Sequence, residues 1–99
     1  MASPRITFYA SNEVPPRHKV TLVSVVGGDF TPCGQATVTI KRGGTVLRHA
    51  TTGVDKDGSF RWDSSLAPQL VCDVELGAVA HDVLLGVDSN ATTTNPYCP

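Results

Sequence analysis

The sequence is short of charge, of aromatic residues and of long apolar runs. Of its 99 residues, 17% are charged and 6% are aromatic, and eight Lys and Arg side chains nearly balance nine Asp and Glu. A formal net charge of -1 creates no field that would gather nucleic acid or an anionic membrane surface. We therefore expect neither nucleic acid nor a membrane as a partner.

No stretch of the chain approaches the roughly 18 apolar residues that a membrane span requires. The most apolar run, residues 20–26, is interrupted by Thr21 and Ser24. The first residues also lack the charged segment followed by an apolar one that marks a secretory signal. We expect a chain with neither a membrane anchor nor an export signal, either made for the cytoplasm or given in its mature form.

Cysteine is scarce, and its spacing matches no common zinc template. Cys33, Cys72 and Cys98 are far apart, and no Cys-x-x-Cys pair occurs. An odd count leaves two alternatives: three reduced thiols that act as small apolar residues, which we favour, or one disulfide and one free thiol. If a disulfide forms, we expect it between Cys33 and Cys72.

Helical periodicity is nearly absent, whereas strand patterns follow one another along the chain. The clearest alternation, in residues 35–41, places Val38 and Ile40 on a face that we expect to be buried. Strands are predicted over residues 5–10, 19–26, 35–41, 45–52, 59–63, 70–76, 81–87 and 91–97. Turn signals about every ten residues predict one all-β domain over residues 1–99, a β-sandwich of seven to eight antiparallel strands.

The most motif-like stretch, VDKDGSFRW at residues 54–62, has two interpretations. With Gly58 at the sixth position of an EF-hand loop, its two aspartates take the third and fifth positions, but the first and twelfth lack their ligands. Two carboxylates alone would not replace the hydration shell of calcium. We therefore predict no metal site, but a tight turn in which Gly58 takes a positive φ and Phe60 and Trp62 enter the core.

Sets of catalytic residues are missing as well. A Gly-x-Ser-x-Gly motif does not occur, and the one cluster to consider is His81 and Asp82 with Cys72. Adjacent residues of a strand point to opposite faces, so His81 and Asp82 cannot serve one site there. We expect neither an enzyme nor a bound cofactor.

Residues 20–60 resemble the Ig-like β-sandwich modules of bacterial surface proteins and tailed-phage virions. The shared pattern is a β-branched strand, Gly-x-x-Phe-x-Pro around Phe30, the alternating strand ATVTI, a Gly hairpin and an Asp-x-Asp-Gly-x-Phe turn ending at Phe60. The resemblance implies an Ig-like sandwich with Phe30 in its core. It indicates little about function, because this fold serves many partners.

Two functions are compatible with the resemblance. The first, which we expect, is a structural protein of a phage virion, a capsid decoration or head or tail accessory protein that docks on capsid or tail subunits or on its own copies. Its candidate docking segments are residues 1–17 and 92–99, with residues 1–4 and 93–99 as possible docking tails. The second is a carbohydrate- or protein-binding module of a secreted or cell-surface bacterial protein, with an extracellular location.

Overall fold

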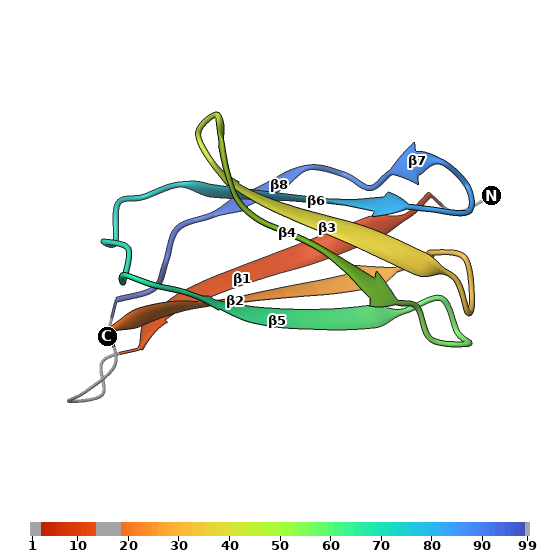
Figure 1. The fold of residues 1–99 in the computed structure, drawn as a ribbon, viewed down its shortest axis with the longest axis horizontal. Helices are drawn as coiled ribbons and strands as arrows, with labels where there is room; N and C mark the ends of the chain where they lie inside the picture. Colours follow the sequence, from red (N-terminus) through yellow and green to blue (C-terminus); the bar gives the residue numbers. More distant parts are fainter. Residues whose placement is uncertain (1–2, 14–18, 99) are drawn as a thin grey trace.

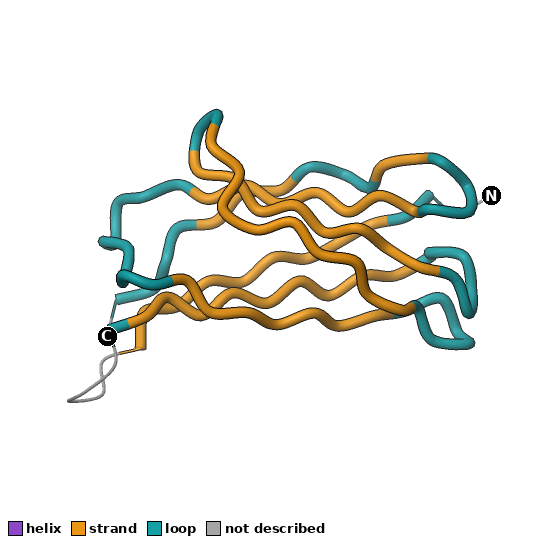
Figure 2. The backbone as a smooth tube through the Cα atoms, in the orientation of Figure 1, coloured by secondary structure: helices purple, strands orange, loops and turns teal. Residues whose placement is uncertain are grey.

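A computed structural model describes residues 3–13 and 19–98 of the chain, which contain strands and no helix. The strands of these residues are β1 (Arg5–Glu13), β2 (Val20–Gly28), β3 (Gln35–Arg42), β4 (Thr45–Gly53), β5 (Phe60–Leu66), β6 (Leu76–Asp82), β7 (Val87–Asp88) and β8 (Thr92–Thr94). The predicted all-β class is confirmed. Figures 1 and 2 show that the strands run along the long axis and that most loops gather at the two ends.

The strands form two antiparallel sheets, which make an all-β sandwich (Figure 1). One sheet has the order β1-β2-β5. The other has the order β4-β3-β6, and the free edge of β6 pairs with β7 at one end and with β8 at the other. The chain crosses between the sheets after β2, β4 and β5. Two of these connections, β2–β3 and β4–β5, lie at the same end of the sandwich as the turn between β6 and β7 (Figure 1).

The core lies between the two sheets and is built by the alternating residues of each strand. Val25 of β2 and Val38 and Ile40 of β3 are fully buried. The Phe30 and Phe60 rings meet edge to face, with centroids 4.9 Å apart, a favourable arrangement for aromatic pairs. Trp62 is half-buried and packs against the margin of this core.

Two predicted strands in the last third are wrong. Residues 70–75, predicted as part of a strand over 70–76, form an irregular connection, and β6 begins only at Leu76. The Thr21 hydroxyl accepts a hydrogen bond from Leu70 N at 2.8 Å, a partner other than a neighbouring strand. The strand predicted over 81–87 instead contains the turn between β6 and β7, because Gly86 N bonds to Asp82 O at 2.8 Å.

The expected cysteine states also require correction. Cys72 is bonded to Cys98, with 5.7 Å between their Cα atoms, whereas Cys33 is exposed and free. The expected Cys33–Cys72 pair does not form because the β2–β3 loop and the β5–β6 connection lie at opposite ends of the sandwich (Figure 1). The favoured alternative of three reduced thiols is likewise not what the structure contains.

The segment after β8 crosses from one sheet to the other. Tyr97 N donates to Ala10 O at 3.0 Å, and Asn12 N donates to Tyr97 O at 2.8 Å, so this segment runs parallel to β1. Cys98 then closes the disulfide. Residues 93–98, expected as a possible docking tail, are thus built into the fold. Residues 5–13 of the other candidate segment form β1, and the candidate docking residues 1, 2, 14–17 and 99 lie outside the described residues.

Candidate functional site

Three loops lie at one end of the sandwich, and two of them are joined by hydrogen bonds between their backbones. They are the β2–β3 loop (residues 29–34), the β4–β5 loop (54–59) and the β6–β7 loop (83–86). Phe30 N donates to Gly58 O at 3.0 Å, and Cys33 N donates to Asp55 O at 3.2 Å. The first two loops therefore hold each other in place.

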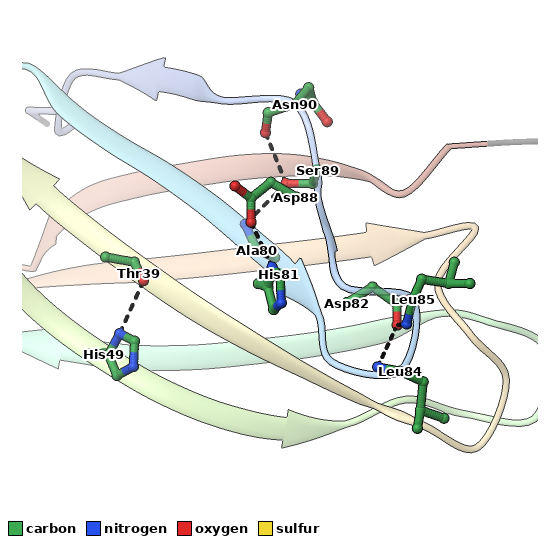
Figure 3. A network of polar contacts seen from close by, with 10 residues as sticks. All are labelled: Thr39, His49, Ala80, His81, Asp82, Leu84, Leu85, Asp88, Ser89 and Asn90. Atoms are coloured by element: carbon green, nitrogen blue, oxygen red, sulfur yellow. Dashed lines mark hydrogen bonds and ion pairs between the residues drawn. The ribbon is translucent and has the colours of Figure 1, made fainter.

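The third loop is attached through a buried carboxylate, that of Asp82 at the end of β6. Its side chain has no exposed surface and accepts a hydrogen bond from Thr31 N at 2.8 Å and from the Thr31 hydroxyl at 2.9 Å. It also accepts from Leu84 N at 3.2 Å and from Leu85 N at 3.1 Å (Figure 3). One side chain thus fixes the β6–β7 loop against the β2–β3 loop.

Electrostatics favour the ionised form of Asp82. Burial by itself would raise the pKa of this carboxyl, because it penalises the charged form. The hydrogen bonds from Leu85 N, Thr31 and Leu84 N outweigh that penalty and bring the pKa below its ordinary value. The loop is therefore held by a charged acceptor, which makes stronger hydrogen bonds than a neutral one.

Beyond this anchor, the β6–β7 loop carries an exposed cluster of large apolar side chains, which we call the apolar loop (residues 83–87). Leu84 is 69% exposed and Leu85 is 57% exposed. Val83 and Val87 are each 43% exposed. Leu84 lies over Gly34 of the β2–β3 loop, where an added Cβ would come within 3.1 Å of its Cδ1 atom. Contiguous exposed apolar side chains on a fixed loop are typical of a surface that binds a partner.

The residues singled out from the sequence form the support beneath these loops. Gly58 has a φ of +84°, and a Cβ on it would lie 2.8 Å from Phe30 O. Phe30 and Phe60 are buried directly below, while Val38, Ile40 and Trp62 lie further along the strands. The structure thus gives these residues packing and turn positions.

The aspartates of the 54–62 stretch do not gather around a common point. Asp57 Oδ1 accepts from Ser59 N at 3.1 Å and from the Ser59 hydroxyl at 2.7 Å, which is the geometry of an Asx turn. The Ser59 hydroxyl, and then its backbone N–H, lower the pKa of Asp57. Across residues 3–13 and 19–98, no three His, Cys, Asp or Glu side chains are placed to hold a metal ion.

The cluster of His81, Asp82 and Cys72 is not brought together. His81 faces outward and its Nδ1 lies 2.7 Å from Asp88 Oδ1, whereas Asp82 points into the protein (Figure 3). The opposite orientation of these two neighbours follows from the strand geometry that the sequence predicted. Cys72 lies in the disulfide at the other end. A second exposed histidine, His49, contacts Thr39 of β3 (Figure 3).

The apolar loop itself was missed by sequence reasoning, which placed residues 81–87 in a strand. A signal was present, because Val83, Leu84 and Leu85 break the alternation of β6 and are followed by Gly86, which has a φ of +69°. Three consecutive apolar residues before a glycine are better explained by a turn than by a half-buried strand.

Comparison of the chain with protein-family models, with curated proteins and with solved structures finds no match. Within the part of the chain that the structure describes, no helix is long and apolar enough to cross a bilayer.

Proposed function

We propose that the chain is a non-enzymatic docking protein that binds another protein through its apolar loop. The observation that carries this proposal is the exposure of Leu84 and Leu85 on a loop whose backbone is held by the buried Asp82 carboxylate. The two leucines leave apolar surface in contact with water on a loop that is already held in place. A partner with a complementary apolar pocket would release that water.

Burial of the two leucines is expected to contribute substantially to the free energy of binding. Full burial of a leucine side chain contributes about 1.5–3 kcal/mol. The loop is already ordered by the bonds from Thr31, Leu84 N and Leu85 N to Asp82, so binding would cost little additional conformational entropy. Where several linked copies bind a repeated surface together, their combined avidity would exceed the affinity of one site.

The strand order supports an Ig-like assignment. If β1, β2 and β5 are matched to Ig strands A, B and E, then β4, β3, β6 and β8 correspond to C′, C, F and G. In this alignment the apolar loop lies between strands F and G. Variable Ig domains bind partners with the loops at one end of the sandwich, and the F–G loop is one of them.

We further propose that the protein works on a surface outside a reducing compartment. The Cys72–Cys98 disulfide supports this, because disulfides persist on virion and cell surfaces and in secreted proteins. A capsid decoration or head or tail accessory protein of a phage virion is our first assignment. A module of a secreted or cell-surface bacterial protein is the second, and the same disulfide favours it.

Site-specific photocrosslinking tests the docking proposal. Benzoylphenylalanine would replace Leu84 in one version of the full chain and Val46 in another, since Val46 of β4 is 52% exposed away from the loop. We expect a discrete adduct in the native host from position 84 alone, and we expect Leu85→Ser to remove it. Equal adducts from both positions, or none from position 84, would overturn the proposal.

The identity of the adduct distinguishes the two locations. A crosslink to a capsid or tail subunit that sediments with particles supports the virion assignment. A crosslink to a cell-envelope protein contradicts it and supports the second assignment. In both cases the docking proposal itself stands.

A further inference from the structure

The outer face of the β1-β2-β5 sheet carries a second feature, a hollow of about 580 Å³ flanked by two tyrosines. Tyr9 of β1 is 57% exposed and Tyr97 of the crossing segment is 68% exposed. Leu22 and Ser24 of β2 lie between Tyr9 and the polar pair Arg61 and Asp63 of β5. Neither the apolar loop nor the sheet that carries it contributes to this hollow.

The pairing of the strands explains why these side chains share one face. Tyr9 is paired with Ser24, and Ser24 is paired with Asp63, so the three form a row across the sheet. Tyr97 is paired with Ser11, which lies two residues beyond Tyr9 on the same face. Both tyrosines therefore lie at one side of the hollow, and the charged pair lies at the other.

The polar side of the hollow offers both donors and acceptors. Arg61 Nε lies 3.3 Å from Asp63 Oδ1 and 3.2 Å from Oδ2. The other N–H groups of the guanidinium do not take part in this contact. Ser24 Oγ is enclosed, and of the buried side-chain polar atoms in the described residues it alone has no hydrogen-bond partner. It belongs to the residue paired with Asp63 on the neighbouring strand.

Charge at this site favours an electrically neutral ligand. The Ser24 hydroxyl first, and then Arg61, lower the pKa of Asp63, so its carboxylate is ionised near neutral pH and balances the guanidinium. An anionic ligand would meet Asp63, and a cationic one would meet Arg61. A peptide strand has no access to the adjacent edge of β1 at Ala10 and Asn12, because Tyr97 already occupies their backbone groups.

We propose that this hollow binds a neutral oligosaccharide. The apolar face of a sugar ring would lie against the exposed rings of Tyr9 and Tyr97, whose rings combine apolar surface with a polar hydroxyl. Sugar hydroxyls both donate and accept, so they would donate to Asp63 and accept from Arg61.

The test uses electrophoresis of the full chain through native gels that contain a neutral polysaccharide. The probes are hydroxyethylcellulose, xylan, galactomannan, dextran and laminarin, each followed by calorimetric titration with the matching hexasaccharide. We expect at least one of them to retard the protein. We expect Tyr9→Ala and Tyr97→Ala each to weaken that binding by about tenfold, as loss of an aromatic contact does.

Two control variants separate this site from the apolar loop and from general damage. Val46→Ala alters an exposed residue of the other sheet, and Leu84→Ser alters the apolar loop. Both should leave polysaccharide retardation unchanged. Circular dichroism melting curves of the tyrosine variants should match that of the unaltered chain, so that lost binding is not lost folding.

Three outcomes would overturn the proposal. In the first, none of the five polysaccharides retards the unaltered chain. In the second, retardation survives the combined Tyr9→Ala and Tyr97→Ala change. In the third, these two tyrosines instead govern capture by a protein partner identified through the Leu84 crosslink, which would assign the hollow to a protein interface.

Discussion

Thr31 and Asp82 are 51 residues apart in the chain, yet the backbone N–H and the hydroxyl of Thr31 both donate to the Asp82 carboxylate, at 2.8 and 2.9 Å. The same carboxylate accepts from the backbone of the apolar loop. One buried charge therefore links the β2–β3 loop to the loop that we propose as the docking site. Local order at this end depends on a contact between distant parts of the sequence.

We expect Asp82→Asn to destabilise the protein by about 2 kcal/mol, because an amide offers one acceptor where the carboxylate offers two, and its NH₂ group faces N–H donors. Urea denaturation at pH 7 measures this loss. The matched control is Asp88→Asn, which removes an exposed carboxylate beside His81 and should change the free energy of unfolding by less than about 0.5 kcal/mol. Equal losses in the two variants would contradict the anchoring role of Asp82.

The contribution of Asp82 should also depend on pH. Its pKa in the folded protein is lowered, so its stabilising effect is fully present above the unfolded value of about 3.9 and is lost as the pH falls through the folded pKa. The stability difference between the unaltered chain and Asp82→Asn should therefore be constant from about pH 5 to 7 and shrink below about pH 4. Asp57 and Asp63, whose pKa values are also lowered, are common to both proteins and cancel in that difference. A difference that grows toward acid pH would contradict the assignment.

Gly58 should be the least replaceable residue of the β4–β5 turn. We expect Gly58→Ala to cost about 2 kcal/mol or more, since an L residue at a φ of +84° is strained and the new Cβ would lie 2.8 Å from Phe30 O. Gly53→Ala, at the end of β4, is the control, because no atom lies within 4 Å of its added Cβ. Thermal and urea unfolding measure the stability that each variant loses. Comparable stability of both would mean that the turn relaxes to accept a side chain.

Calcium should leave the melting temperature of the protein unchanged. Asp57, one of the two aspartates of the turn, already accepts two hydrogen bonds from Ser59, and the other ligand positions of an EF-hand loop are not occupied by carboxylates. A ligand that binds the folded state raises its stability in proportion to the logarithm of its concentration. Melting curves in chelator and in millimolar calcium should therefore coincide, and a reproducible rise with calcium would contradict the turn assignment.

Burial could be predicted from the sequence where buried and exposed residues alternate along a single strand. The alternation of Val38 and Ile40 in β3 reflects a strand with one face in the core, and that requirement is visible within a few residues. The turn at Gly58 was equally local, because a glycine after aspartates signals a positive φ. These features needed no knowledge of the rest of the chain.

The failures arose where a distant partner decides the conformation. Residues 70–75 alternate like a strand, but Leu70 N bonds to the hydroxyl of Thr21, 49 residues away. The correct disulfide depends on the crossing of the C-terminal segment to β1, which brings Cys98 to Cys72. Neither contact can be read from local periodicity, since both depend on the topology of the two sheets. The same holds for the tyrosine hollow, which exists only because Tyr97 is placed next to β1.

The Cys72–Cys98 disulfide should stabilise the protein by limiting the freedom of the unfolded chain, and it also fixes the end of the segment that runs beside β1. Loop-closure entropy for cysteines 26 residues apart predicts a loss of about 3.5 kcal/mol in Cys98→Ser. Hydrogen exchange should then accelerate at the amides of Asn12 and Tyr97, whose bonds join the segment to β1, more than in the β3–β6 pairing. Cys33→Ser, which removes the free and exposed thiol, should change neither stability nor exchange. Thiol alkylation followed by mass spectrometry should find one reactive cysteine in the unaltered chain, and a bond that includes Cys33 would contradict this pairing.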